Sequence, residues 1–145
     1  MRSLSAFVDT PRAAKRLVNV FRLVKVLIGP VAREEFVGSG YQTVLLELAI
    51  ASGFPDLSRE VFGYILRHPD GEFWDLIDDL RPRALSEGVG NAVTASLDGD
   101  QARRWRNMVE AVLSLKATFS VSTADAMKWA PLTQRFSFAG PVLGA

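Results

Sequence analysis

Apolar and polar residues follow helical spacing through positions 11–28, and this stretch has a marked start and a marked end. Its apolar members recur at i, i+3, i+4, i+7, i+10 and i+11 and so share one side of a helix: Leu17, Val20, Phe21, Val24, Leu27 and Ile28. Thr10 can accept a hydrogen bond from the first turn, Pro11 suits the first helical position, and Gly29-Pro30 ends the pattern. We therefore expect a helix over 11–28 whose apolar stripe is buried in the core.

Further segments with helical spacing follow, and together they predict an all-α fold. A short turn of helix is expected within 30–37, broken by Gly38 and Gly40. Segment 41–52 is apolar nearly all round, which is typical of a buried central helix, and Gly53 ends it. The remaining helices are expected at 56–67, 72–80 and 101–119, and a last short one runs to Trp129. Ser122 or Thr123 marks the start of this last helix and Pro131 ends it. The pattern thus predicts an orthogonal bundle of about six helices.

The length and composition are those of one globular domain. The chain has 145 residues, of which 48% are apolar, enough to bury most of a single core. Leu4, Phe7 and Val8 are expected to fold back on the first helix as a staple-like contact. We expect one helical domain at 1–138 and a frayed tail at 139–145. Within the domain, a first part at 1–85 and a second part at 98–130 are joined by a loop at 86–99.

The chain contains no cysteine, which excludes disulfides, thiolate metal sites and a cysteine nucleophile. His68 is the only histidine and has no candidate partner, and Asp75, Asp78 and Asp79 show the spacing of any solvated helical face, so we predict no metal site. No window holds the roughly 18 uninterrupted apolar residues of a membrane span. The segment before the first helix, residues 1–9, is too short and reaches an acidic residue too early to be a signal sequence. Together with the absence of cysteine, this leads us to expect a cytoplasmic location.

The polar side of the 11–28 helix is strongly basic. It carries Arg12, Lys15, Arg16, Asn19, Arg22 and Lys25. Cations near a helix N-terminus face the positive end of the dipole and cost a few tenths of a kcal/mol each unless an anion lies opposite. A phosphate would supply that anion, because helix N-termini present unpaired N–H groups. The alternative is that these residues are solvated charges on an ordinary amphipathic helix.

Residues 10–23 read Thr-Pro-Arg-Ala-Ala-Lys-Arg-Leu-Val-Asn-Val-Phe-Arg-Leu. This run resembles the segment that follows the nucleotide-binding core in KAP-type and related STAND-like and AAA-like bacterial P-loop NTPases. The family pattern is T/S-P-R, two residues, K-R, two residues, N, two residues, R-L, and each of its positions is kept. Residues 41–55, where an apolar helix precedes Gly-Phe-Pro, resemble a segment further downstream in the same proteins.

The resemblance implies a helical lid or sensor subdomain. In such a subdomain Arg12 would sense the phosphate of a bound nucleotide, with Lys15 and Arg16 sharing that role. The sequence has no G-x-x-x-x-G-K-[ST] motif and no candidate magnesium ligand after an apolar strand. We therefore expect no catalytic residue and no cofactor bound by the chain alone. ATP or GTP with Mg²⁺ is expected only in complex with a nucleotide-binding core, whether the chain is a fragment or a separate piece.

A second group of cations, Arg103, Arg104 and Arg106, flanks Trp105 near the start of the 101–119 helix. With Arg22, these residues are candidates to contact a partner or a nucleic acid, Trp105 stacking on a base. The alternative is a core tryptophan whose neighbouring arginines are solvated or paired with Asp98, Asp100 or the acidic middle of the chain. Because the net charge is only +1, nucleic-acid binding is disfavoured. The competing function is a small helical adaptor whose basic first helix docks on an acidic protein surface.

Overall fold

The computed structural model describes residues 6–82 and 99–135, and these residues form an all-α bundle. Its seven α-helices are α1 (Pro11–Leu27), α2 (Pro30–Glu35), α3 (Tyr41–Gly53), α4 (Pro55–Arg67), α5 (Phe73–Asp79), α6 (Gly99–Leu113) and α7 (Thr123–Gln134), with a π-helical turn, η2 (Phe36–Gly40), before α3. The predicted all-α class is confirmed. The predicted tail at 139–145 and nearly all of the predicted loop at 86–99 lie outside the described residues.

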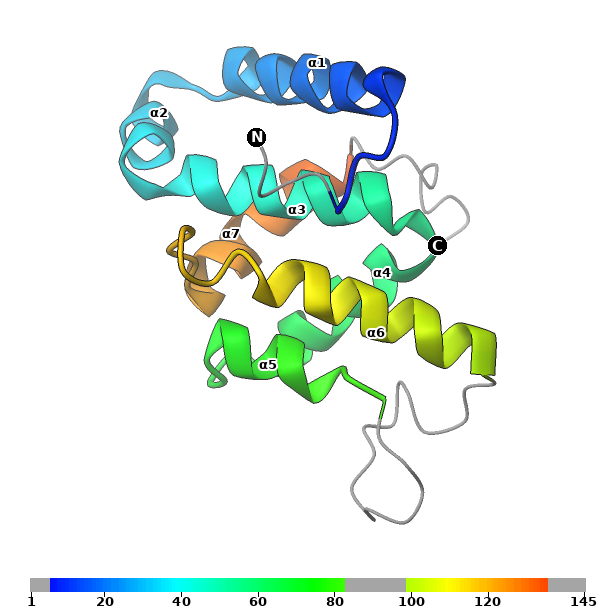
Figure 1. The fold of residues 1–145 in the computed structure, drawn as a ribbon. Coiled ribbons are helices and arrows are strands. Elements are labelled where there is room, and N and C mark those ends of the chain that lie inside the picture. The colour runs from blue at the N-terminus through cyan, green and yellow to red at the C-terminus, as the bar shows by residue number, and fades with distance from the viewer. Residues whose placement is uncertain (1–5, 83–98, 136–145) are drawn as a thin grey trace, which may run out of the picture.

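Helix α3 is the centre of the bundle, as its nearly uniform apolar composition predicted. It packs against α1, α4, α6 and α7, and its contact with α7 is the most extensive. In Figure 1 it crosses the middle of the molecule, with α1 along one edge and α5 near the opposite one. Eight of its thirteen residues are buried, and each large apolar side chain among them contributes roughly 1.5 to 3 kcal/mol by leaving water.

Helix α1 begins and ends as its sequence predicted. The Thr10 hydroxyl accepts a hydrogen bond from the Ala13 N–H (3.1 Å), and the Ile28 N–H donates to the Val24 carbonyl at the other end. Leu17, Val24 and Ile28 are buried, and Val20 and Phe21 pack partly against the core. Leu27 was expected to be buried, but it is exposed. Helix α1 packs mainly on α3, so only the narrow stripe of α1 that faces α3 is covered.

The approach to α1 also differs from the prediction. Phe7 does not act as a staple on α1 but packs edge-to-face against Phe54, with ring centroids 5.9 Å apart. The backbone of Phe7 lies so close to Gly53 that a Cβ there would come within 2.7 Å of the Phe7 carbonyl oxygen. The N-terminal segment is therefore anchored at the corner between α3 and α4. Leu4 lies outside the described residues.

Gly38 and Gly40 do not break the helix that starts at Pro30, contrary to the prediction. The chain passes from α2 through the π-turn η2 into α3 without leaving helical geometry. A Cβ on Gly40 would lie 2.8 Å from Nε1 of Trp129, so glycine here lets the Trp129 ring of α7 pack on the backbone. The glycine serves close packing and does not end the helix.

The two C-terminal helices differ from their predicted bounds in opposite directions. Helix α6 ends at Leu113, and residues 114–118 form turns, so Phe119 is not helical, contrary to the prediction. Leu115, within these turns, is fully buried. Helix α7 starts at the predicted Ser122 cap but runs through Pro131 to Gln134. Proline removes one backbone bond, and the buried residues Trp129, Ala130 and Thr133 around it hold α7 against its neighbours.

None of the helices described here is both long enough and apolar enough to cross a membrane.

Candidate functional site

The basic residues of α1 lie on the side that faces away from α3. Arg12, Lys15, Arg16, Arg22 and Lys25 are all exposed, and the first turn of the helix contains no acidic residue. No ion pair links Arg12, Lys15, Arg22 or Lys25 to any other residue in the ranges 6–82 and 99–135. Arg12 and Lys15 therefore place positive charge, without an ion pair to another described residue, at the positive end of a helix dipole.

The last turns of the same surface are apolar. Leu23, Val26 and Leu27 are 47%, 74% and 58% exposed, respectively. Val26 and Leu27 follow Leu23 by three and four residues, so both adjoin Leu23 on the helix surface. Isolated exposed apolar residues are ordinary, but three neighbours on one helix form a patch that a partner can cover.

The basic and apolar residues occupy the same two lines along α1. Lys15, Arg22 and Val26 follow i, i+7 and i+11, so they lie on one side of the helix. A second line runs through Arg12, Arg16, Leu23 and Leu27 at i, i+4, i+11 and i+15. The outward side of α1 thus changes from basic to apolar along its length. We call this surface, Arg12, Lys15, Arg16, Arg22, Leu23, Val26 and Leu27, the α1 face.

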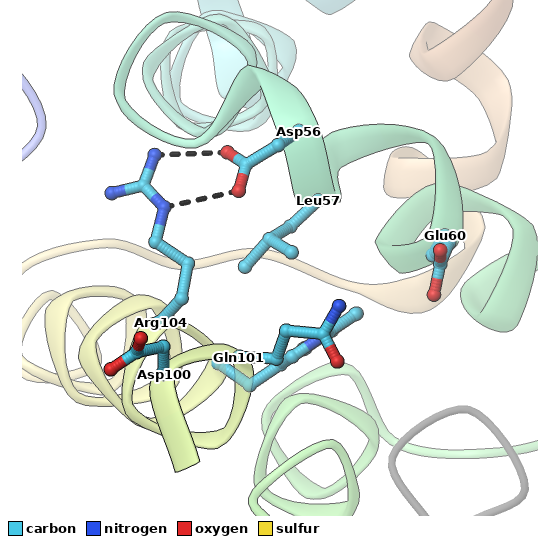
Figure 2. A pocket seen from close by; sticks show the side chains of 7 residues that line it. Asp56, Leu57, Glu60, Asp100, Gln101 and Arg104 are labelled. Atoms are coloured by element: carbon cyan, nitrogen blue, oxygen red, sulfur yellow. Dashed lines mark hydrogen bonds and ion pairs between the residues drawn. The ribbon is translucent and has the colours of Figure 1, made fainter. Parts of the chain in front are cut away.

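The second predicted cluster, on α6, is arranged differently. Arg104 forms two hydrogen bonds with the Asp56 carboxylate of α4, Nε to Oδ2 at 3.2 Å and Nη2 to Oδ1 at 2.9 Å (Figure 2). Arg104 also donates from Nη2 to the Gly53 carbonyl oxygen (3.0 Å) and lies 4.5 Å from the Phe54 ring centroid. The hydrogen bond from Arg104 is the main reason that the pKa of Asp56 lies below its usual value. This arginine holds α6 against the corner between α3 and α4.

Trp105 corrects the hypothesis of a base-stacking tryptophan. Its side chain is only 2% exposed and belongs to the core, so its ring is not available to stack on a base. Arg103 and Arg106 are exposed on α6. The alternative raised from the sequence, a core tryptophan with a neighbouring arginine paired to the acidic middle of the chain, describes Trp105 and Arg104 as they lie in the fold.

A pocket of about 370 Å³ lies between the starts of α4 and α6, shown in Figure 2. Its lining consists of Asp56, Leu57, Glu60, Asp100, Gln101, Arg104 and Trp105. The lining contains three carboxylates and only one arginine, which is already paired with Asp56, so the pocket does not suit a phosphate. The sequence did not predict this pocket, because its two walls come from distant segments of the chain. Asp56 on one wall and Arg104 on the other are 48 residues apart.

Sequence reasoning also missed a buried acid in the middle of α3. Glu47 is 2% exposed. Within residues 6–82 and 99–135, neither of its carboxylate oxygens has a hydrogen-bond donor, and the hydroxyl oxygen of Thr43 likewise lacks a partner. Thr133 of α7 lies beside the carboxylate, but its hydroxyl donates to the Ala130 carbonyl oxygen at 3.0 Å. Burial raises the pKa of Glu47 well above its ordinary value. The available signal was a single charged residue in a largely apolar helix.

Comparison of the chain with models of known protein families, with curated proteins and with solved structures found no match. Function must therefore be inferred from the α1 face and from the resemblance of residues 10–23 to the P-loop NTPase segment.

Proposed function

We propose that the chain is a helical lid or sensor subdomain of a P-loop NTPase, which acts on a nucleotide held by a separate or adjoining nucleotide-binding core. Arg12 reaches the nucleotide phosphate, and Lys15 and Arg16 share the charge. The observation that carries the proposal is the exposed basic start of α1, with no acid in its first turn and no ion pair for Arg12 or Lys15 among the described residues.

A phosphate suits this surface because cations at the start of a helix are unfavourable on their own, and an anion placed beside them removes that cost. The backbone adds little here, since Pro11 has no N–H group and the Ala13 N–H already donates to the Thr10 hydroxyl. The side-chain cations would therefore supply most of the attraction for the anion. The resemblance of residues 10–23 to the segment after a nucleotide-binding core supplies the identity of the phosphate, namely that of ATP or GTP.

The nucleotide and its Mg²⁺ belong to the core in this proposal. The chain has no G-x-x-x-x-G-K-[ST] motif, and that motif supplies the backbone cradle and the lysine for the phosphates. We therefore expect no hydrolysis of ATP or GTP by the chain alone. A reducing, nucleotide-rich cytoplasm fits both this function and a chain without cysteine.

A second candidate function is a small helical adaptor that docks on an acidic protein surface. The exposed apolar residues Leu23, Val26 and Leu27 favour it, because a surface that only senses phosphate does not need an apolar end. Binding of nucleic acid is not proposed, since the net charge is +1 and the ring of Trp105 is buried.

The sensor proposal is tested by thermal unfolding of the wild type and Arg12→Ala with and without sulfate, which stands in for the nucleotide phosphate. An anion at ten times its Kd stabilises the wild type by about 1.4 kcal/mol, and Arg12→Ala should lose most of that gain. Lys25→Ala is the matched control, because Lys25 lies in the last turn of the same helix. The anion response of Lys25→Ala should equal that of the wild type.

The result without anion separates a sensor from a structural residue. Removing a cation from the start of α1 should leave the melting temperature unchanged or raise it by the few tenths of a kcal/mol of the dipole effect. A loss of more than about 1 kcal/mol would make Arg12 a structural residue. In that case, or if sulfate stabilises the wild type no better than Arg12→Ala, the sensor proposal fails and the adaptor becomes the better candidate.

A further inference from the structure

Two surfaces of opposite charge lie near opposite edges of the molecule. The α1 face is basic and apolar, and α1 runs along one edge (Figure 1). Near the other edge are α5 and the turn before it. Between residues 70 and 79 the chain carries five acids and no Lys or Arg: Asp70, Glu72, Asp75, Asp78 and Asp79. We call these five residues the α5 face.

Neither surface is neutralised by the other within one molecule. Helix α1 packs mainly on α3, whereas α5 packs on α4 and α6. Asp78 pairs with Arg81, and Asp79 accepts a bond from the Tyr64 hydroxyl (3.3 Å). Asp70 and Asp75 are exposed and form no ion pair with another residue of the described part of the chain. Both faces therefore keep charge that no residue of the described part of the chain compensates, and a second molecule can supply the opposite charge.

We propose that the α1 face of one copy of this chain docks on the α5 face of a second copy, so that the chain associates head to tail. Charge complementarity selects this partner, because the cations at the start of α1 meet the acids of residues 70–79. The apolar end of α1 meets the end of α4 and the following turn, where Leu66 and Pro69 are exposed directly before the acidic segment.

Charge disfavours symmetric contacts centred on the charged part of either face. A two-fold contact at the start of α1 would bring cations against cations, and one through α5 would bring acids against acids. A head-to-tail contact pairs unlike surfaces and leaves one of each free at the two ends. In such a heterologous contact each added copy presents a free face to the next one, unless the rotation between neighbouring copies closes the assembly into a ring. Assemblies larger than dimers should therefore form as the concentration rises.

An anionic membrane is the other partner that a basic and apolar helix can suit. An interfacial helix needs its apolar residues along one side and its cations along the other. In α1 the two kinds follow one another on the same line, as in Lys15, Arg22 and Val26. A flat hydrocarbon surface would therefore meet cations where it needs apolar groups, and a protein surface with an acidic part fits better.

The experiment is sedimentation velocity of the wild type at low salt, between about 10 µM and 1 mM, where weak heterologous contacts are populated. The sedimentation coefficient should rise with concentration, and raising the salt to about 0.3 M should weaken association about tenfold, since exposed charges are screened. The test involves no nucleotide, so its outcome is independent of the sensor proposal, although both use the start of α1.

Two neutralising variants test the faces separately. Lys15→Gln/Arg22→Gln removes charge from the α1 face and Asp70→Asn/Asp75→Asn removes charge from the α5 face, and each variant should stay monomeric at concentrations where the wild type assembles. Mixed in equal amounts, they should form dimers and nothing larger, because each pair retains one intact contact. Arg103→Gln/Arg106→Gln changes the net charge as much as the first variant does and should assemble like the wild type.

Four results would overturn the proposal. They are a wild type that stays monomeric up to about 1 mM at low salt, assembly by either neutralised variant, failure of their mixture to form dimers, and loss of assembly in the Arg103→Gln/Arg106→Gln control. Co-sedimentation of the wild type with vesicles containing phosphatidylserine, under conditions where it does not self-associate, would assign the α1 face to a membrane surface instead.

Discussion

Arg104 and Asp56 are 48 residues apart in the sequence and form a two-bond ion pair that fastens α6 to the start of α4. The guanidinium also caps the end of α3 through the Gly53 carbonyl oxygen. One side chain thus joins three helices around the corner where Phe7 packs on Phe54. In the sequence this arginine belongs to a basic cluster that suggests ligand binding, and in the fold it connects helices.

Asp56→Asn should lower the free energy of unfolding by less than about 1 kcal/mol at neutral pH, because the pair is partly exposed and screened by solvent. The pKa of Asp56 is lowered in the folded state, so its contribution is present above the unfolded pKa of about 3.9 and is lost as the pH falls through the folded value. Urea unfolding between pH 2 and 7 measures this.

Glu60→Gln is the control for Asp56→Asn, since Glu60 is an exposed acid of the same helix that lines the same pocket and forms no ion pair with another described residue. It should change stability by no more than about 0.5 kcal/mol. Equal effects of the two substitutions at every pH would mean that the Arg104 pair contributes nothing.

Glu47→Gln should stabilise the protein at neutral pH and remove part of its pH dependence. Burial raises the pKa of Glu47, so the folded state binds a proton that the unfolded state releases above about pH 4.3. The stability contribution of this group is therefore complete below the unfolded pKa and is lost as the pH rises through the folded pKa. Glutamine keeps the shape and cannot ionise.

Denaturant unfolding of the wild type and Glu47→Gln from pH 4 to pH 8 provides the measurement. The wild type should lose stability across this range relative to the variant. If Glu47→Gln is instead less stable than the wild type at pH 7, the carboxylate is ionised and paired in the folded protein, and our description of it as a buried, unpartnered acid is wrong.

Leu17→Ala and Leu27→Ala should differ strongly although both residues belong to the apolar pattern of one helix. Leu17 is fully buried against the core, and its truncation should cost about 2 to 5 kcal/mol because it leaves a cavity. Leu27 is exposed, and its truncation should change stability by no more than about 0.5 kcal/mol. Chemical denaturation compares the pair directly, and similar costs would refute the orientation of α1.

Gly40→Ala and Gly38→Ala form a second matched pair in η2. A Cβ at position 40 would overlap the Trp129 ring, so this substitution should destabilise the protein by about 1 to 3 kcal/mol. A Cβ at position 38 meets nothing within 4 Å, and alanine there should be neutral or stabilise by up to about 1 kcal/mol. Melting temperatures followed by tryptophan fluorescence separate the two cases, and a harmless Gly40→Ala would contradict the packing of α7 on η2.

The sequence by itself determined the features that depend on neighbours a few residues away. Thr10 and Pro11 mark the start of α1 and Ser122 marks the start of α7, because a cap acts within one helical turn. The nearly uniform apolar composition of residues 41–52 predicted that α3 is central, since a helix without a polar side can only be buried.

Only the tertiary structure decided which of several compatible local roles a residue takes. Pro131 would end an isolated helix. In the fold, α7 continues through Pro131 to Gln134, because the buried side chains of Trp129 and Thr133 hold the helix in place on both sides of the proline. Leu27 continues the apolar spacing of α1, yet α3 covers too narrow a stripe to reach it. Arg104 finds Asp56 because the fold brings α4 and α6 together, and spacing along the chain contains no information on a partner 48 residues away.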